Sequence, residues 1–282
     1  GAEVVALDSM TLYRGLDIGT AKPPMAERGG VPHHLIDVLD PWESASVAEY
    51  RRWALAAVAA ITARGRRALF VGGTALYLKA LLRGLFEGPG ADSDLRLALE
   101  QEAARRGPDA LHARLARLDP PTARRLHPND LRRVIRALEV IARTGQPLSA
   151  QQAEHDRPAP SGVHVFALQR PRAELHERIG RRVEQMFAAG LIDEVRALLA
   201  GPRPLDPVPA QAVGYREVID LLAGRATRPE AVERVRARTR QFAKRQETWF
   251  RGLDEVIPWP VGPGEPPEAT AEGLARCLGG PK

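Results

Sequence analysis

Residues 68–82, with the sequence ALFVGGTALYLKALL, decide the fold of this chain. The first four residues, ALFV, have the length and composition of a buried parallel strand. A Gly-Gly-Thr turn follows, and residues 75–82 then have the apolar spacing of a helix. This order of strand, glycine turn and helix is typical of sheets whose ligands bind at the carboxyl ends of the strands.

The segments that precede this stretch extend the same pattern. Residues 3–7, EVVAL, predict a second buried strand, and Asp8 follows directly at its carboxyl end. Residues 46–63 have helical spacing and are closed by an Arg-Gly pair. Strand, helix, strand, turn and helix together predict a doubly wound α/β sheet.

The composition is that of an ordinary globular protein, with 282 residues, 44% apolar and 27% charged. No run of eighteen apolar residues and no secretory signal occurs, so we expect no membrane partner. The single cysteine, Cys277, excludes an internal disulfide framework and fits a reducing cytoplasm. We therefore expect a cytoplasmic protein, and we expect it to be a monomer.

Positive charge gathers in two segments. The net charge is +6, and residues 96–143 carry eleven arginines against six acidic residues. Residues 225–251 carry nine lysines and arginines against three acidic residues. Each segment is either a surface for a polyanionic partner or a solvated basic helix face.

The remaining pattern divides the chain into four parts. Helical spacing dominates the segment after the first sheet region, a polar loop is expected at residues 151–162, and the apolar run at 163–168 predicts a strand that rejoins the sheet. Two further helices and a long basic helix at residues 229–251 follow. The predicted parts are a catalytic α/β core at 1–93, a mainly helical insertion at 94–160, a continuation of the core at 161–255 and a weakly ordered tail at 256–282.

Polar groups follow both predicted strands where parallel sheets place their active sites. Asp8 can accept a proton, and the turn at Gly72, Gly73 and Thr74 offers N–H groups and a hydroxyl to an anion. Taken alone, the aspartate is as well explained by a helix cap, and the turn by a tight strand–helix connection. Arg178 and Arg182 lie four residues apart on one helix face, where they can hold a phosphate or simply face solvent.

Five motifs occur in this chain, and their order and spacing resemble those of the tRNA dimethylallyltransferase (isopentenyltransferase) family. They are DSMTLYRGLDIGTAKPP at 8–24, VGGTALYLK at 71–79, NDLRRVIRALEV at 129–140, VGYR at 213–216 and TRQFAKRQETWFR at 239–251. The resemblance extends from residue 1 to about residue 252. It implies a P-loop-kinase-like, nucleotide-binding α/β fold with a helical insertion domain.

The resemblance also implies an activity. Such an enzyme transfers a dimethylallyl group from dimethylallyl diphosphate to N6 of the adenosine at position 37 of tRNA, beside the anticodon. Its partners are the diphosphate and the anticodon stem-loop of tRNA, and its cofactor is Mg²⁺. The adenosine is flipped out of the loop and meets the diphosphate from the opposite side.

Site residues follow from matching positions in the family's motifs. Asp8 matches the catalytic aspartate that accepts the proton of the N6 amine, and Thr74 matches a threonine that touches the target nucleotide or the diphosphate. The implied diphosphate-binding residues are Arg178, Arg182, Gly72 and Gly73. The implied tRNA-binding residues are Asp8, Ser9, Met10, Thr11, Arg96, Arg132, Arg133, Val134, Ile135, Arg136, Gly214, Tyr215, Arg216, Lys244, Arg245, Gln246 and Trp249.

One family feature does not occur in the 282 residues. Family members begin with a strand and a Gly-x-x-x-x-Gly-Lys-[Ser/Thr] phosphate-binding loop, which would also supply a hydroxyl ligand for Mg²⁺. We therefore expect the first strand and its P-loop to be missing, two neighbouring strands to be unpaired and the metal ligands to be unknown. We expect this chain to be inactive without that loop.

Three other classes of protein share part of this pattern. A small-molecule kinase would also need the phosphate-binding loop and has no use for the basic helix with its KRQ motif. A transferase that prenylates free adenine nucleotides would not need the arginine-rich segment at 96–143. A non-catalytic RNA-binding protein would not need Asp8 and Thr74 at neighbouring strand ends.

Overall fold

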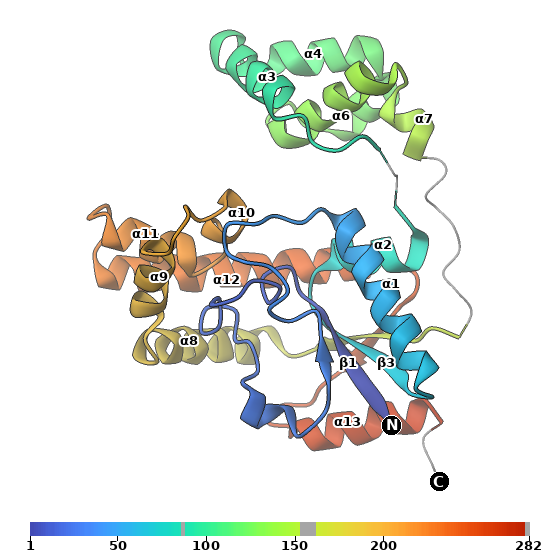
Figure 1. The fold of residues 1–282 in the computed structure, drawn as a ribbon, viewed down its shortest axis with the longest axis vertical. Helices are drawn as coiled ribbons and strands as arrows, with labels where there is room; N and C mark the ends of the chain where they lie inside the picture. Colours follow the sequence, from blue (N-terminus) through green and yellow to red (C-terminus); the bar gives the residue numbers. More distant parts are fainter. Residues whose placement is uncertain (86–87, 153–161, 280–282) are drawn as a thin grey trace. The chain divides into compact units, whose positions relative to one another are not determined.

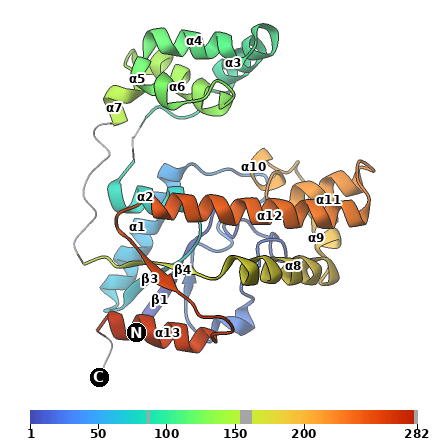
Figure 2. The ribbon, with the colours of Figure 1, turned by 180° about the vertical axis from the view of Figure 1, so that it is seen from behind.

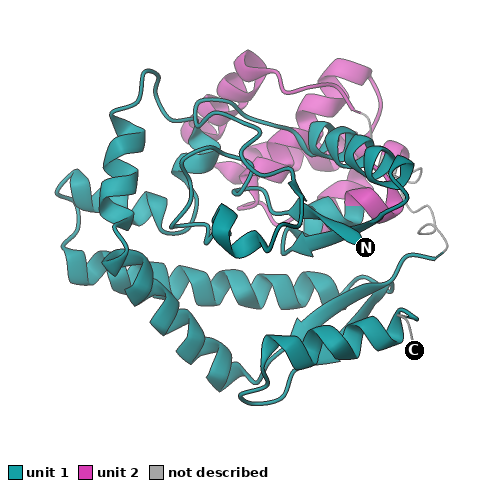
Figure 3. Cartoon of the chain, turned by 60° about the horizontal axis from the view of Figure 1, so that its bottom comes forward, with its two compact units in different colours: residues 1–79, 160–282 teal, residues 80–159 magenta. Residues whose placement is uncertain are grey.

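The computed structural model describes residues 1–85, 88–152 and 162–279 (Figure 1). The chain forms two compact units, which Figure 3 shows in teal and magenta. Unit 1 contains Gly1–Lys79 and Pro160–Lys282, and unit 2 contains Ala80–Ala159. Unit 2 overlaps the segment 94–160, for which an insertion is predicted, and begins earlier in the sequence. No described helix has the length and apolarity required to cross a membrane.

The first sheet of unit 1 contains three parallel strands in the order β2-β1-β3. Their bounds are β1 Ala2–Leu7, β2 His33–His34 and β3 Arg67–Gly72. The central strand, β1, is buried over its last three residues and aligns residue by residue with β3, so that Leu7 pairs with Gly72. This register brings the carboxyl ends of the two strands predicted from the sequence to the same place.

Two helices flank these strands. Helix α1, Val47–Ala63, begins at a capping box in which the Ser46 hydroxyl accepts the Glu49 N–H and the Glu49 carboxylate accepts the Ser46 N–H. Helix α2, Ala75–Arg83, follows β3 after the glycine turn. Tyr50 of α1 donates a hydrogen bond to the Ala6 carbonyl and stacks on Tyr77 of α2. These contacts join both helices and β1 in one core.

The strand predicted to rejoin the first sheet forms a separate sheet instead. Strand β4, Val165–Gln169, pairs in parallel with β5, Val256–Pro260, in a two-stranded sheet. Within the described residues, no strand pairs with the outer edge of β3 or of β4, so each sheet ends there. Leu69 and Val71 of β3 and Leu168 of β4 are about half exposed. The prediction that this strand rejoins the first sheet is therefore wrong for the described residues.

The prediction of a weakly ordered tail at 256–282 is also wrong over most of its length. Residues 256–260 form β5, and Pro267–Cys277 form helix α13. Trp259 meets the edge of Phe166 at 5.7 Å between ring centroids, and a Cβ at Gly273 would lie 2.9 Å from its ring. The tail is ordered because β4 offers Trp259 an apolar partner across the two-stranded sheet.

The remaining helices of unit 1 pack beside these sheets. Their bounds are α8 Arg172–Ala188, α9 Leu191–Leu199, α10 Pro207–Ala210, α11 Tyr215–Leu222 and α12 Arg228–Arg251. The two longest, α8 and α12, run side by side, as Figure 2 shows. Buried apolar residues at helical spacing on α8 (Ile179, Val183 and Phe187) explain why this face of the helix turns inward. A short 3-10 helix, η1, occupies Met25–Arg28.

Unit 2 is a cluster of helices around its own apolar core. The helices are α3 Ser93–Arg106, α4 Pro108–Leu118, α5 Pro120–Arg125, α6 Leu131–Thr144 and α7 Leu148–Gln152. Leu111 and Leu115 of α4 pack against Val134 and Leu138 of α6, and all four are buried. Of the loop predicted at 151–162, the first two residues belong to α7, and residues 153–161 lie outside the described residues.

A buried carboxylate connects α3 to α6 in unit 2. Glu139 is fully buried and accepts hydrogen bonds from the guanidinium groups of Arg96 and Arg136 and from the backbone N–H of Asp92. Burial alone would raise the pKa of Glu139, but these three donors lower it to about 2. Two of the arginines predicted to bind RNA therefore also hold the helices of unit 2 together.

The Glu139 cluster predicts how the stability of unit 2 depends on pH. Because the pKa of Glu139 is about 2 in the folded state and 4.5 ordinarily, its stabilising contribution is complete above about pH 4.5. The contribution is lost as the pH falls towards 2. We expect Glu139→Gln to lower the free energy of unfolding at pH 7, and the difference from the unmodified chain to shrink between pH 5 and pH 3.

Urea unfolding followed by far-ultraviolet circular dichroism measures this difference. Glu100→Gln is the control, because Glu100 is an exposed carboxylate on α3. The control should show a small difference that does not change with pH. A Glu139→Gln difference that stayed constant from pH 7 to pH 3 would contradict the assigned role of the carboxylate.

Candidate functional site

The candidate site lies at the carboxyl ends of β1 and β3, where two polar segments touch. The Thr74 backbone N–H donates to the Leu7 carbonyl at 3.1 Å. The Ser9 N–H donates to the Thr74 hydroxyl, also at 3.1 Å. The structure therefore brings Asp8 and Thr74 together, as their positions after neighbouring parallel strands predict.

Asp8 is half-buried and is fixed by its own turn. Its Oδ1 atom accepts the N–H groups of Met10 at 2.7 Å and Thr11 at 3.3 Å. No described residue donates a hydrogen bond to the other oxygen, Oδ2. One oxygen thus fixes the orientation of the carboxylate, while the other can accept a proton from a bound molecule.

Gly72 is required by the geometry of the turn. Its φ angle is 155°, and a Cβ at this position would lie 2.3 Å from the Leu7 carbonyl oxygen. The next residue, Gly73, accepts a hydrogen bond at 2.8 Å from the Gln246 amide of α12. The two glycines therefore allow β3 to approach β1 and α12 to approach the turn.

Of the two predicted diphosphate-binding arginines, Arg182 faces the candidate site. Its Nη2 atom donates to the Thr20 carbonyl at 3.4 Å. Desolvation lowers the pKa of Arg182 from its ordinary value, and the negative charge of Asp8 opposes that shift. Arg178 instead pairs with Glu174 at 3.0 Å, and Glu174 also binds Arg170. Arg182 is therefore the better placed of the two to hold an anion.

Glu194 of α9 is a residue of this region that the sequence did not single out. Its Oε2 atom accepts the backbone N–H groups of Asp17 at 3.1 Å and Ile18 at 2.7 Å, and its Oε1 atom accepts that of Gly19 at 3.3 Å. The Tyr215 hydroxyl donates to Oε1 at 2.6 Å. One carboxylate therefore holds three consecutive N–H groups of the motif at 8–24, and the next residue, Thr20, is the one whose carbonyl binds Arg182.

Tyr215 completes this contact from inside the protein. It is fully buried, and a Cβ at Gly19 would lie 2.3 Å from its ring. Burial and the hydrogen bond to Glu194 raise the pKa of Tyr215 well above its usual range. Gly214 is buried as well. Of the residues predicted to bind RNA in this motif, only Arg216 is exposed.

Lys22, in the same motif as Gly19, has a structural role. Its amine is buried and donates to the Tyr13 carbonyl at 2.8 Å, to Asp17 at 2.6 Å and to Asp37 at 2.5 Å. These bonds fold residues 13–37 back on themselves. His34 is structural too, since its Nε2 atom lies 2.7 Å from the buried carboxylate of Glu3.

The other residues predicted to bind RNA fall into two groups. Val134 and Ile135 have buried side chains in the core of unit 2, because they lie on the apolar face of α6. They support the helix and do not offer side chains to RNA. The exposed residues are Arg132 and Arg133 on α6 and Lys244, Arg245 and Trp249 on α12. Gln246 is half-buried, and Ser9, Met10 and Thr11 are half-buried or buried beside Asp8.

The described residues contain no cluster of three or more His, Cys, Asp or Glu side chains that could hold a metal ion. Two side-chain hydroxyls lie beside Asp8: that of Thr74 accepts the Ser9 N–H, and that of Thr11 donates to the Asp8 carbonyl at 3.4 Å. These residues alone do not make a resident Mg²⁺ site.

Comparison with known protein families gives one match that spans most of the chain. A family model described as IPP transferase matches residues 11–253. The chain is similar to tRNA dimethylallyltransferase 1 of Trichlorobacter lovleyi, with 47% identity over 93% of this chain and 86% of the relative. It is also similar to the tRNA dimethylallyltransferase of Rhodopirellula baltica, with 48% identity over 90% of this chain and 76% of the relative.

Two solved structures resemble the chain along nearly its whole length. The full-length tRNA isopentenylpyrophosphate transferase of Bacillus halodurans is 40% identical, with a TM-score of 0.69 over 99% of this chain and 88% of that chain. A eukaryotic dimethylallyltransferase acting on tRNA is 26% identical, with a TM-score of 0.81 over 99% of this chain and 74% of that chain.

The contacts of Glu194 lead to a prediction about local order. Glu194→Ala removes the acceptor of three backbone N–H groups, so we expect amide hydrogen exchange at residues 17–19 to accelerate by about tenfold or more. Glu194→Gln retains one acceptor oxygen, so its exchange rate at residues 17–19 should lie between those of the unmodified chain and of Glu194→Ala. Mass spectrometry of peptides covering residues 15–22 measures the rates.

Asp193→Ala is the matched control, because Asp193 is the exposed neighbour of Glu194 on α9 and pairs only with Arg196 among the described residues. It should leave exchange at residues 17–19 unchanged. Equal exchange rates at residues 17–19 in the Glu194→Ala and Asp193→Ala chains would show that Glu194 does not hold this loop.

Proposed function

The chain belongs to the IPP transferase family of enzymes, and we propose that it transfers a dimethylallyl group from dimethylallyl diphosphate to N6 of adenosine 37 of tRNA. The relatives described above are named tRNA dimethylallyltransferases, and the chain matches them over most of their length. This match supports tRNA prenylation. The observation that supports the chemistry most strongly is that Asp8 and Thr74 meet at the carboxyl ends of β1 and β3, while Arg182, held at the Thr20 carbonyl, is close enough for the charge of Asp8 to act on its pKa.

Asp8 acts as the base. The N6 amine of adenine is a weak nucleophile, so it must lose a proton as its nitrogen attacks the first carbon of the dimethylallyl group. Asp8 accepts that proton through Oδ2, the oxygen that the turn at Met10 and Thr11 leaves without a hydrogen bond. The new bond joins nitrogen to carbon, and the bond between that carbon and the diphosphate oxygen breaks.

Arg182 and Thr74 act on the other participants. The electron pair of the broken bond leaves with the diphosphate, whose growing negative charge Arg182 stabilises. The Thr74 hydroxyl already accepts the Ser9 N–H, so its own proton is available to an oxygen or nitrogen of the substrate. A bound Mg²⁺ would offset part of the negative charge of the diphosphate, and the described residues include no group of three or more His, Cys, Asp or Glu side chains that would hold it.

The RNA is held by exposed cations outside the strand-end site. Arg132 and Arg133 of unit 2 and Lys244 and Arg245 of unit 1 are exposed, and they supply positive charge for backbone phosphates. Trp249 is exposed on the same helix as Lys244 and offers a surface on which a base can stack. A transferase that served free adenine nucleotides would have no need of these surfaces.

Asp8→Asn tests the base directly. Asparagine retains an oxygen that can accept the N–H groups of Met10 and Thr11, so the turn should persist while the proton acceptor is lost. In a version of the chain extended with a phosphate-binding loop, we expect single-turnover prenyl transfer to fall about 10²–10⁴-fold. Affinity for an anticodon stem-loop should change little. Near-normal transfer by Asp8→Asn would show that another group takes the proton.

The phosphate-binding loop itself can be tested with the same assay. No Gly-x-x-x-x-Gly-Lys-[Ser/Thr] segment occurs in the 282 residues, and Arg182 with the turn at 72–74 leaves a multiply charged diphosphate few ligands. We expect the 282-residue chain to give no prenyl-adenosine and the extended version to give it. Salt-sensitive RNA binding should be present in both. Measurable product from the 282-residue chain would contradict the proposed need for the loop.

A further inference from the structure

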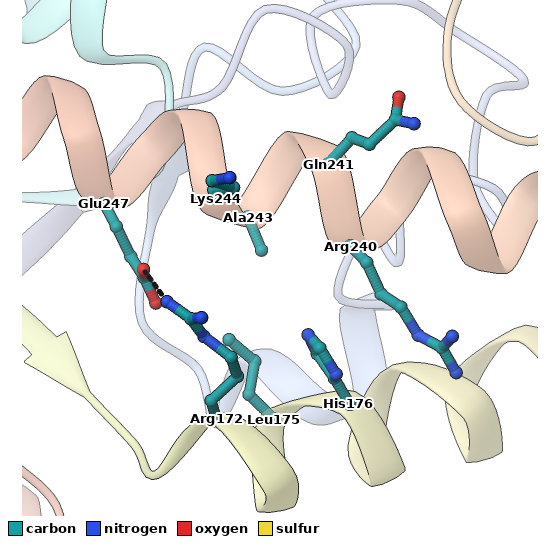
Figure 4. A pocket seen from close by; sticks show the side chains of 8 residues that line it. All are labelled: Arg172, Leu175, His176, Arg240, Gln241, Ala243, Lys244 and Glu247. Carbon is teal, nitrogen blue, oxygen red and sulfur yellow. Dashed lines mark ion pairs between the residues drawn. The ribbon is translucent and has the colours of Figure 1, made fainter.

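A groove between α8 and α12 of unit 1 is lined by more positively charged side chains than carboxylates. Figure 4 shows its side chains projecting from the two helices, and its volume is about 200 Å³. It is lined by Arg172, Leu175, His176, Arg240, Gln241, Ala243, Lys244 and Glu247. None of the residues of the strand-end site, Asp8, Thr74 or Arg182, belongs to this lining.

The basic residues of the groove face one another in two pairs. Arg172 and His176 lie four residues apart on α8, and Arg240 and Lys244 lie four residues apart on α12, so each pair shares one helix face. Leu175 and Ala243 provide an apolar floor between the helices. Cations therefore line an apolar depression from both sides.

Only one carboxylate lines the groove. Glu247 lies 4.0 Å from Arg172, at the limit of an ion pair. In the described part of the chain, neither Arg240 nor Lys244 forms an ion pair. Three permanent positive charges thus share one negative charge, and their mutual repulsion favours the binding of an anion.

We propose that this groove binds a phosphate group and that, in the proposed reaction, the group is a backbone phosphate of the RNA. Two arginines offer planar, forked donors that suit phosphate oxygens, and Lys244 adds a mobile point charge. The dimethylallyl diphosphate must lie where the reacting carbon can meet Asp8, whereas this groove is lined by neither Asp8 nor Arg182. The choice of RNA rests on the proposed function, but the capacity to bind phosphate rests on the groove itself.

The test compares two double variants that remove the same charge from the same two helices. The groove variant is Arg172→Gln with Arg240→Gln, which leaves Lys244, already assigned to RNA above, unchanged. The control variant is Arg181→Gln with Arg234→Gln, two exposed arginines of α8 and α12 outside the groove. Both are made in the 282-residue chain, and thermal unfolding is compared first.

Binding of an anticodon stem-loop RNA is then measured at several salt concentrations. We expect the groove variant to bind about tenfold or more weakly than the control variant, with a shallower dependence of log affinity on log salt. Each lost phosphate contact should reduce that slope by about 0.7–0.9. If the groove variant unfolds at a lower temperature, the single changes Arg240→Gln and Arg240→Lys replace it, and lysine should restore part of the affinity.

A second arm separates the sources of phosphate. Inorganic pyrophosphate is titrated into both variants by calorimetry. One outcome is that the groove variant no longer binds pyrophosphate but binds RNA as tightly as the control variant does. The groove would then be a phosphate site for free diphosphate, and the assignment to RNA would be overturned. Equal behaviour of the two variants towards both ligands would overturn the proposal, as would binding of an acidic peptide as strong as that of RNA.

Failure of this inference differs from failure of the proposed function. If the groove does not bind phosphate, the extended chain still prenylates RNA, and both double variants do so equally. If the proposed function is wrong, no variant of the extended chain yields prenyl-adenosine, whatever the groove binds.

Discussion

The carboxylate of Glu194 is the contact on which the arrangement of the candidate site depends. It accepts three consecutive backbone N–H groups, from Asp17 to Gly19, and joins the loop beside the first sheet to helix α9. Without an acceptor, these N–H groups would lose their partners in a region that Tyr215 closes from within. The same loop presents the Thr20 carbonyl to Arg182. The orientation of a cation that faces Asp8 is thus set by a carboxylate on another helix.

Local sequence was sufficient to predict the strand ends. The apolar runs before Asp8 and Gly72 identify β1 and β3, and parallel pairing then requires their carboxyl ends to meet. Glu194 could not be found in this way, because its partners are backbone N–H groups, which leave no mark on residue type. An acidic residue in the first turn of a helix is also common for reasons of the helix dipole alone. Strand β5 escaped prediction because two prolines within VIPWP, Pro258 and Pro260, suggest a loop, although an edge strand tolerates them.

Charge counting overstates the surface available to RNA. The segment 96–143 contains eleven arginines, yet Arg96 and Arg136 are bound to the buried carboxylate of Glu139. Arg132 and Arg133, on the same helix as Arg136, are exposed. The difference arises because α6 has one apolar face, formed by residues such as Val134 and Leu138, which turns inward. Arg136 on α6 and Arg96 on α3 reach the buried Glu139 on that side. Position around a helix therefore decides which basic side chains can serve a polyanion.

The hydrogen bonds to Glu194 also bear on how the chain acquires its structure during synthesis. They join residues 175 to 177 positions apart, whereas the core of unit 2 is built from helices that follow one another directly. Contacts that close long loops carry a larger entropic cost and form later than local ones. As the ribosome releases the chain, unit 2 can fold before α9 and Tyr215 have been synthesised, and until then the loop at residues 17–20 lacks its hydrogen-bond partners. The loop at residues 17–20 is therefore synthesised before α9 and becomes ordered only once α9 is present.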